Sequence, residues 1–444
     1  MTVALGPSFR HGVHPAEHKE ATAHLPIERM PFVRRYVLPL GQHIGAPSVP
    51  VVRVGQEVER GELLAKAGGF VSASLHSPVR GRVTAIGPQP HPQGRLAPAI
   101  VVSADPFADQ RLPEGEAVDW RAMPVDDFVA EVQAGGLVGM GGAAFPTHVK
   151  YRTAEGKPIE RLVLNGCECE PFLTADHRLM VEQPESVVRG ALIAAARLGA
   201  REIVIGVELN KPDAIAALGA AVPEDAPVRV VGLRVKYPQG AEKMLIRALF
   251  GLEVPSGKLP LDVGIVVNNV ATVAAMADWL LHRRPLVERI VTVSGPGVRR
   301  PANLLVPIGT PVREVLEHCG GLLPDTRELV MGGPMMGAPL ASLDVPVMKG
   351  TSGLLAFTAA EARLPHEYTC IRCGRCVDAC PQLLNPSRLA KLARAGRWEE
   401  MERWFVADCV ECGSCSFACP SGIPIVQLIR VAKSALRDQK AKAS

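Results

Sequence analysis

The chain has 444 residues, 47% of them hydrophobic, which is enough to bury more than one core and predicts three or four domains. Basic and acidic residues are interspersed at a formal net charge of +4, so the composition does not predict nucleic-acid binding. The N-terminus lacks the residue order of a secretory signal, and polar residues interrupt the longest apolar stretch, residues 264–281, so we expect neither export nor a membrane span.

The first 110 residues are predicted to form a small β module. Apolar residues alternate around glycine corners in residues 54–64 and 77–83, as a small and sharply turned barrel requires. This spacing resembles that of biotinyl- and lipoyl-type hammerhead domains. No lysine occupies a central hairpin tip in the context of a modified lysine, so we expect a structural barrel-sandwich module and not a swinging-arm carrier.

An α/β domain is predicted over residues 120–285, after a Pro-, Asp- and Glu-rich linker. A helix with acidic residues in its first turn is expected at 124–132. Strands are then expected at 161–164, 202–207, 228–235 and 264–267, and helices at 187–198, 213–221, 241–249 and 271–281. Short β-rich runs and a glycine turn at 331–337 predict a further β-grasp-like module at 286–350.

Eight of the eleven cysteines fall in two C-x2-C-x2-C-x3-C-P runs, and we expect residues 360–444 to form a helical ferredoxin-like domain. In this motif the fourth cysteine of each run ligates the other cluster of a pair of [4Fe–4S] clusters. The predicted ligand sets are therefore Cys370, Cys373, Cys376 and Cys419 for one cluster, and Cys380, Cys409, Cys412 and Cys415 for the other. Zinc is the alternative, but it would leave surplus thiolates.

A basic tail follows the second cysteine run, with Arg430, Lys433, Arg437, Lys440 and Lys442 opposed only by Asp438. The simpler interpretation is a solvated, frayed helix. Docking to an acidic protein or to an anionic lipid surface is the alternative.

Glycines crowd the segment 135–150, whose backbone N–H groups are accessible to a phosphate. A dinucleotide fingerprint should follow a strand, whereas here a helix-like stretch precedes the loop, so by itself the segment is equally a tight turn. Segments 164–171 and 266–272 change this balance. Each lies at the end of a strand-like run, where open α/β sheets place ligand-binding loops, and their amides and carboxylates suit a flavin ring and ribose hydroxyls.

These three segments resemble, in the same order, the FMN- and NADH-binding flavoprotein subunit of respiratory complex I. The whole chain, from Phe-Arg-His-Gly-Val-His-Pro at residues 9–15 to the final Cys-Pro-Ser-Gly-Ile-Pro, resembles the RnfC family of the Rnf complex. The resemblance implies a peripheral subunit on the cytoplasmic face of the bacterial inner membrane that passes electrons between NAD(H) and ferredoxin. Membrane-spanning and ferredoxin-like partner subunits would translocate the ion. FMN is implied because a hydride carries two electrons, whereas a [4Fe–4S] cluster accepts one.

The resemblance also implies roles for individual residues. FMN would contact Gly139, Gly141, Lys150, Asn165, Glu168, Asn268 and Asn269, with Glu242 as a weaker match. Phe145 would stack on the dinucleotide, and Glu170 would accept hydrogen bonds from its hydroxyls.

The chain departs from these patterns at three positions, with Ala144 and His11 in place of glycines and Cys167 in place of an aspartate. Two other functions are considered. One is a soluble flavin and iron–sulfur oxidoreductase such as a cobalamin reductase, and the other is an electron-carrying adaptor with a vestigial nucleotide site.

Overall fold

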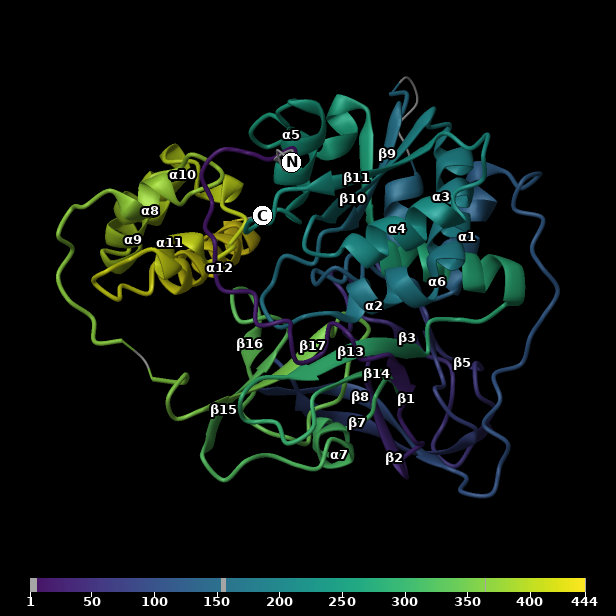
Figure 1. The fold of residues 1–444 in the computed structure, drawn as a ribbon. Helices are drawn as coiled ribbons and strands as arrows, with labels where there is room; N and C mark the ends of the chain where they lie inside the picture. Colours follow the sequence, from purple (N-terminus) through teal and green to yellow (C-terminus); the bar gives the residue numbers. More distant parts are fainter. Residues whose placement is uncertain (1–5, 153–156, 364, 444) are drawn as a thin grey trace.

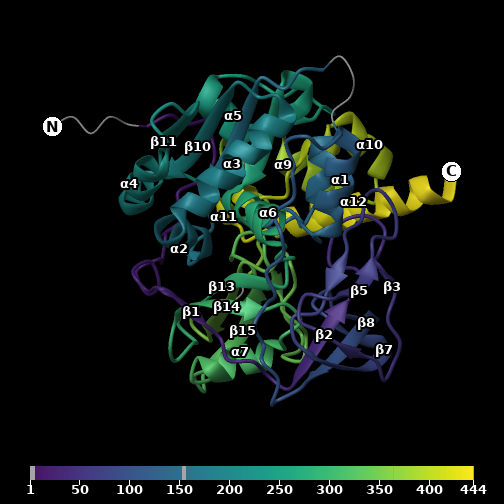
Figure 2. The ribbon, with the colours of Figure 1, turned by 90° about the vertical axis from the view of Figure 1, so that its right-hand side faces the viewer.

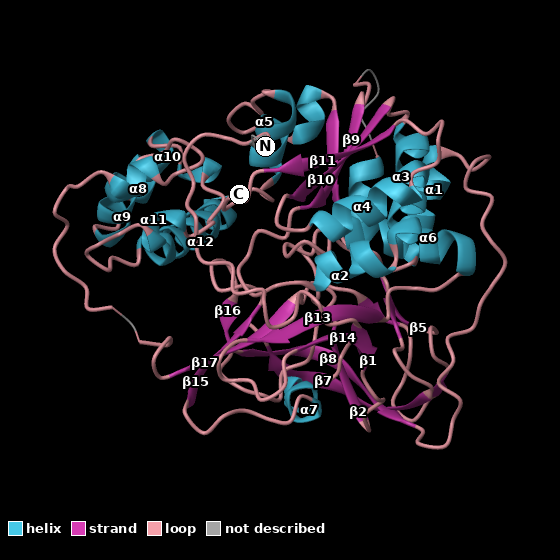
Figure 3. Ribbon diagram, in the orientation of Figure 1, coloured by secondary structure: helices cyan, strands magenta, loops and turns pink. Residues whose placement is uncertain are grey.

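The structure, a computed structural model, describes residues 6–152, 157–363 and 365–443. Helices concentrate in an α/β domain and in the C-terminal domain, whereas the two β-rich modules lie together below the α/β domain (Figures 1 and 3). The fold is therefore the expected α/β multi-domain arrangement. Within the described residues, no helix has both the length and the apolar character needed to cross a membrane.

The N-terminal module is built from two small sheets that share one core. Alternate residues such as Tyr36, Leu38 and Ile100 are fully buried between the sheets, as alternation around glycine corners predicts. One sheet has the order β2-β8-β7-β4, and the other has the order β3-β5-β6. Their strands are β2 (Arg35–Pro39), β3 (Val49–Pro50), β4 (Glu57–Val58), β5 (Leu63–Lys66), β6 (Leu75–His76), β7 (Gly81–His91) and β8 (Arg95–Ala104).

The α/β domain contains a four-stranded parallel sheet in the order β11-β10-β9-β12. Both faces are covered: Leu162 and Leu164 of β9 join the core under α3 and α6, whereas Val163 packs with Leu245 of α5 on the other face. This explains why the strands are continuous apolar runs. The strands are β9 (Arg161–Gly166), β10 (Glu202–Glu208), β11 (Val228–Leu233) and β12 (Ile265–Asn269). The helices are α1 (Val125–Ala134), α2 (Ala175–Glu182), α3 (Pro184–Leu198), α4 (Pro212–Ala221), α5 (Glu242–Phe250) and α6 (Val270–His282).

A third, six-stranded sheet has the order β1-β14-β13-β17-β15-β16 and carries α7 (Val312–His318). Two of its strands come from outside the predicted module at 286–350. β1 (Ile27–Arg29) pairs with β14, and the fully buried β17 (Gly353–Thr358) lies between β13 and β15. Local patterns reveal strands but not their long-range pairing, which explains the difference. The remaining strands are β13 (Glu288–Ser294), β14 (Ala302–Pro307), β15 (Thr326–Met331) and β16 (Ala338–Pro339).

The C-terminal domain packs its helices around one small core that includes Leu389, Met401 and Ile429. Its helices are α8 (Arg375–Asp378), α9 (Pro386–Arg394), α10 (Trp398–Arg403), α11 (Ser414–Phe417) and α12 (Ile425–Ala443). α9 and α10 are the helix pair expected between the two cysteine runs. The N-terminal segment passes between this domain and the α/β domain (Figure 1), and Figure 2 shows α12 extending across the back of the molecule.

The basic tail is partly tied to the C-terminal domain. Lys433 of α12 donates a 2.8 Å hydrogen bond to the carbonyl of Cys409 and pairs with Glu411 at 2.7 Å. Arg430 also pairs with Glu411, and Lys440 pairs with Glu402 at 2.6 Å. The interpretation of a wholly solvated, frayed helix is therefore wrong, because two of these cations stabilise the loop of the second cysteine run.

Candidate functional site

The strand order of the α/β sheet reverses between β9 and β12. In open parallel sheets, ligands bind outside the carboxyl ends of the strands at such a point. Asn165 ends β9 and Asn269 ends β12, and the two residues are direct neighbours in the parallel register. The two segments singled out from the sequence therefore meet at this edge of the sheet.

Asn269 organises this edge through both ends of its amide. Its oxygen caps α6 by accepting hydrogen bonds from the amides of Ala271 (2.9 Å) and Thr272 (3.3 Å). Its amide nitrogen donates to Asp176 at 2.6 Å. Burial, reinforced by the nearby Glu168 carboxylate, raises the pKa of Asp176 to about 7. The site therefore holds an acidic group that titrates near neutrality.

The glycine loop lies directly beside Asn269. The loop closes on itself through a 2.7 Å hydrogen bond from the amide of Gly139 to the carbonyl of Phe145. Met140 is fixed from two sides, because its amide donates to the Thr272 hydroxyl (2.9 Å) and its carbonyl accepts from the buried Arg289 guanidinium (2.7 Å). The backbone of the loop is thus held rigidly before any ligand binds.

The tip of the loop leaves room for a ligand above the backbone. A Cβ atom added at Gly141 would stand 3.5 Å from the side chain of Asn269, and one added at Gly142 would meet no heavy atom within 4 Å. Gly142 has φ +114°, a conformation that L side chains rarely adopt. The accessible amides of this tip fit a phosphate-bearing cofactor.

The Asn-Gly-Cys-Glu-Cys-Glu-Pro loop is held from below by buried lysines. The ammonium of Lys19 donates to the carbonyls of Glu168 and Glu170, each at 2.9 Å, and Lys211 donates to the carbonyl of Cys167 at 2.7 Å. Both oxygens of Glu168 cap α2, accepting from the amides of residues 176 and 177 at 2.8 and 3.1 Å. Glu168 therefore has a structural role in the loop in addition to the cofactor contact expected of it.

The other expected flavin residues surround the same strand ends. Lys150 donates to Glu242 at 2.6 Å and to the carbonyl of Val267 at 2.7 Å, so the weaker match, Glu242, is brought to Lys150. The amide of Asn165 donates to the carbonyl of Gly240 (2.7 Å), and that of the buried Asn268 donates to the Tyr151 hydroxyl (2.8 Å). All eight residues expected at FMN lie on the glycine loop, the ends of β9 and β12, or segments bonded to them.

The two residues expected at the dinucleotide lie at the edges of this site. Phe145 is half-buried on the returning limb of the glycine loop. One oxygen of Glu170 accepts a 3.0 Å hydrogen bond from the amide of Met335, and the other is buried without a partner among the described residues. Burial raises the pKa of Glu170 to about 7. Glu170 thus already binds the glycine turn of the third sheet and keeps one oxygen available.

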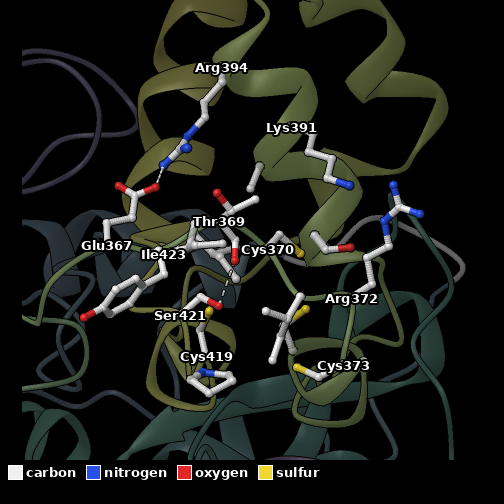
Figure 4. A pocket seen from close by; sticks show the side chains of 18 residues that line it. Glu367, Thr369, Cys370, Arg372, Cys373, Lys391, Arg394, Cys419, Ser421 and Ile423 are labelled. Carbon is white, nitrogen blue, oxygen red and sulfur yellow. Dashed lines mark hydrogen bonds and ion pairs between the residues drawn. The ribbon is translucent and has the colours of Figure 1, made fainter.

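One set of four cysteines lines a single cavity of about 480 Å³ in the C-terminal domain (Figure 4). Cys370, Cys373 and Cys376 come from the first run, and Cys419 comes from the end of the second. The structure therefore brings together the crossed set that the motif predicts.

The other four cysteines form a second group at the side of this domain that faces the α/β domain. Burial, with the neighbouring Cys412 and Cys380 thiols, raises the pKa of Cys409 to about 11. Cys380, Cys412 and Cys415 are buried. Thiolates in such a group need compensating charge, which iron supplies, so both sets suit iron–sulfur clusters.

The group formed by Cys380, Cys409, Cys412 and Cys415, here called the inner set, packs against the flavin-binding side. Cys412 shares a small apolar cluster with Val13 and Tyr237, and the Tyr237 hydroxyl donates to the carbonyl of Cys412 at 2.7 Å. Asp408 accepts a hydrogen bond from the amide of Gly257 at 3.3 Å. The set at the cavity of Figure 4, here called the outer set, lies on the opposite run of the motif.

Several residues of the site escaped the sequence analysis. Asp176 could have been noticed as an acid in the first turn of the helix that follows the Asn-Gly-Cys-Glu-Cys-Glu-Pro segment. Gln239 is fully buried, and neither of its amide atoms has a partner among the described residues, but only its position before Gly240 hinted at a role. Arg289 and Tyr237 reach the site through tertiary packing, which no local pattern reveals.

Two of the three departures from the family patterns keep the backbone shape of the residue they replace. Ala144 has φ +50° and His11 has φ +63°, both in the left-handed region that favours the glycine expected there. The His11 ring also contacts the carbonyl of Asp378 at 2.7 Å. The third, Cys167, is fully buried beneath the loop.

Comparison with known proteins assigns each module. Residues 7–106 match the RnfC barrel sandwich hybrid domain, and residues 132–278 match the Nuo51 FMN-binding domain. Residues 290–339 match the SLBB domain, and residues 369–424 match the 4Fe-4S dicluster domain. The chain thus has an FMN-binding domain and a domain for two [4Fe–4S] clusters, and the zinc alternative falls.

A solved structure shares the fold. In a crystal structure of an air-oxidised NAD+-reducing [NiFe]-hydrogenase, one chain aligns with 73% of this chain and 66% of its own length, with a TM-score of 0.51 and 22% identity.

Curated relatives cover nearly the whole chain. The RnfC-type subunit of the proton-translocating ferredoxin:NAD+ oxidoreductase complex of Clostridium ljungdahlii is 46% identical over 97% of this chain and 94% of its own. Its counterpart in the Na+-translocating complex of Acetobacterium woodii is 42% identical over the full length of both chains. The corresponding subunit of the ion-translocating oxidoreductase complex of Rhodobacter capsulatus is 43% identical over 98% of this chain and 84% of its own. The chain belongs to the RnfC family, whose members are subunits of the Rnf-type ion-translocating oxidoreductase complexes.

Proposed function

We propose that the chain is the NADH- and FMN-binding subunit of a ferredoxin:NAD+ oxidoreductase complex, and that it passes electrons between NAD(H) and the other subunits. The relatives named for this activity match over almost the full length of the chain. One observation carries the proposal. The edge of the sheet at Asn165 and Asn269 and the inner cysteine set flank the same short segment, since Gly240 accepts from Asn165 while Tyr237 holds Cys412.

The residues of this chain supply binding and orientation. The amides at Gly139 and Gly141 would bind the phosphate of FMN, and Lys150, Asn165, Glu168, Asn268 and Asn269, with Glu242, would position the remainder. Phe145 would stack on the nicotinamide dinucleotide, and Glu170 would accept from its hydroxyls through the oxygen that lacks a partner among the described residues. Bound FMN supplies the exchange between a two-electron hydride and single electrons.

The outer and inner cysteine sets would each hold one [4Fe–4S] cluster. Two clusters together hold two electrons, which equals one hydride. Ion translocation would belong to membrane-spanning partner subunits, with this chain bound at the cytoplasmic face of the bacterial membrane.

Substitution in the glycine loop tests the proposal. We would purify the chain anaerobically with FMN and reconstituted clusters and follow bleaching of the flavin absorbance by NADH. Gly141→Val should abolish FMN retention and bleaching, because its side chain fills the space over Asn269. Gly219→Val, on the exposed face of α4 with no atom within 4 Å of the added Cβ, is the control. An adaptor with a vestigial site would show no bleaching in the unchanged chain either.

A further inference from the structure

The two cysteine sets differ in what covers them. The loop of the inner set is joined to the α/β domain by Tyr237 and by the hydrogen bond from Gly257 to Asp408. By contrast, no hydrogen bond or ion pair between described side chains joins residues 370–374 of the outer set to the α/β domain. Ile371 and Tyr368, at the rim of the outer cavity, are 68% and 62% exposed. The outer set therefore faces away from the flavin-binding side.

The rim of the outer cavity is apolar and positively charged. Arg372 and Lys391 are exposed, and neither forms an ion pair with any residue in the described part of the chain. A third cation, Arg394, is neutralised by Glu367, which is the only acidic residue among the described residues that line the cavity (Figure 4). Two uncompensated cations and two exposed apolar side chains thus surround the cysteines.

We propose that Tyr368, Ile371, Arg372 and Lys391, here called the outer face, form the docking surface for a protein that carries an acidic patch around its own one-electron centre. The proposal rests on the proposed function, since it names the partner of the same electron pathway. One electron moves between the two centres without a proton, so that one centre is oxidised as the other is reduced.

The structure favours a protein over a lipid surface as the occupant. An apolar centre with a charged rim is the usual composition of a protein interface. Uncompensated cations at a rim steer an acidic partner and set its orientation. A lipid surface could satisfy the same charges, but it would cover the outer cysteines with material that accepts no electrons.

The test measures binding as well as turnover. The probe is an acidic bacterial ferredoxin with two [4Fe–4S] clusters, whose affinity for the full chain with bound cofactors is titrated at low and high salt. Arg372→Glu/Lys391→Glu reverses the charge of the outer face, and Arg372→Gln/Lys391→Gln removes it. The matched control is Arg53→Glu/Lys66→Glu, which makes the same change at exposed residues of the N-terminal module. Iron content and circular dichroism establish that each variant is folded and loaded.

The charge reversal should weaken ferredoxin binding about tenfold or more, the neutral variant should weaken it less, and the control should leave it unchanged. Binding by the unchanged chain should also weaken with salt. Equal affinities in the reversal and the control, or no binding by the unchanged chain, would overturn the proposal.

Vesicles of phosphatidylglycerol and phosphatidylcholine test the lipid alternative. Sedimentation with these vesicles that is lost only in the charge reversal, with ferredoxin affinity unaltered, would assign the outer face to lipid and overturn the proposal. NADH-dependent reduction of ferricyanide, a small acceptor that needs no docking surface, should be unchanged in every variant. Its absence in the unchanged chain would count against the proposed function and not against the outer face.

Discussion

The hydroxyl of Tyr237 donates a 2.7 Å hydrogen bond to the carbonyl of Cys412, so a side chain of the α/β domain holds the loop that carries the inner cysteine set. The same ring packs against Val13 of the N-terminal segment. Three parts of the chain that lie far apart in sequence therefore meet where electrons would pass between the flavin site and the clusters.

Removing this hydrogen bond should loosen the inner loop. Tyr237→Phe leaves the ring in place but leaves the buried carbonyl of Cys412 without its donor, at a cost of about 1 kcal/mol. The amides of residues 412–415 should then exchange with solvent about fivefold faster, as measured by hydrogen–deuterium exchange. Tyr151→Phe, which removes another buried hydroxyl with one hydrogen-bond partner, Asn268, should leave these amides unchanged. Equal exchange in the two variants would contradict the coupling.

Glu170 should make the stability of the chain depend on pH. Its folded pKa of about 7 lies above the usual value of 4.5 because of burial, so its contribution is fully present below pH 4.5 and is lost as the pH rises through 7. Glu170→Gln removes this loss. The melting temperature of the variant, relative to the unchanged chain, should therefore be a few degrees higher at pH 8 than at pH 5. Glu224→Gln, at an exposed position, should show no such difference, and a Glu170→Gln difference that does not vary with pH would refute the assignment.

Asn269 should link helix capping to flavin binding. Asn269→Ala removes the cap of α6 and should cost about 1 kcal/mol of stability. Because the same side chain adjoins Gly141 and Asp176, FMN affinity measured by fluorescence titration should fall about tenfold. Asn385→Ala removes the matching cap of α9, where Asn385 accepts from the amide of Arg388, and should cost similar stability without loss of FMN. FMN affinity that is equal in the two variants would show that Asn269 is only a cap.

Ala144 should tolerate glycine unusually well. Its φ of +50° costs a residue with a side chain about 1 kcal/mol, which nearly offsets the gain in unfolded-chain entropy when glycine is introduced. Ala144→Gly should therefore change the free energy of unfolding by less than about 0.5 kcal/mol in denaturant titrations. Ala194→Gly, in the buried interior of α3, should lose about 1 kcal/mol or more. A loss at position 144 as large as at 194 would contradict the strain argument.

The sequence was sufficient for the elements and the crossed cysteine sets because both follow from local spacing. The glycine loop and the ends of β9 and β12 were also found locally, as glycines and polar residues that follow apolar runs. What escaped was long-range pairing. β1 and β17 join the third sheet from either side of the predicted module, and Arg289 and Tyr237 reach the site only through packing of separate modules. No pattern within a short window encodes such contacts.

The most direct test of the account follows electrons from the clusters to NAD+. The chain with FMN and reconstituted clusters is reduced photochemically and mixed rapidly with NAD+, while NADH absorbance and the EPR signals of the clusters are recorded. NADH should form as both cluster signals disappear. In Cys412→Ser, which removes a ligand of the inner set, the outer signal should persist and NADH formation should collapse. Reoxidation of the outer cluster at the original rate in that variant would contradict the passage of electrons through the inner set.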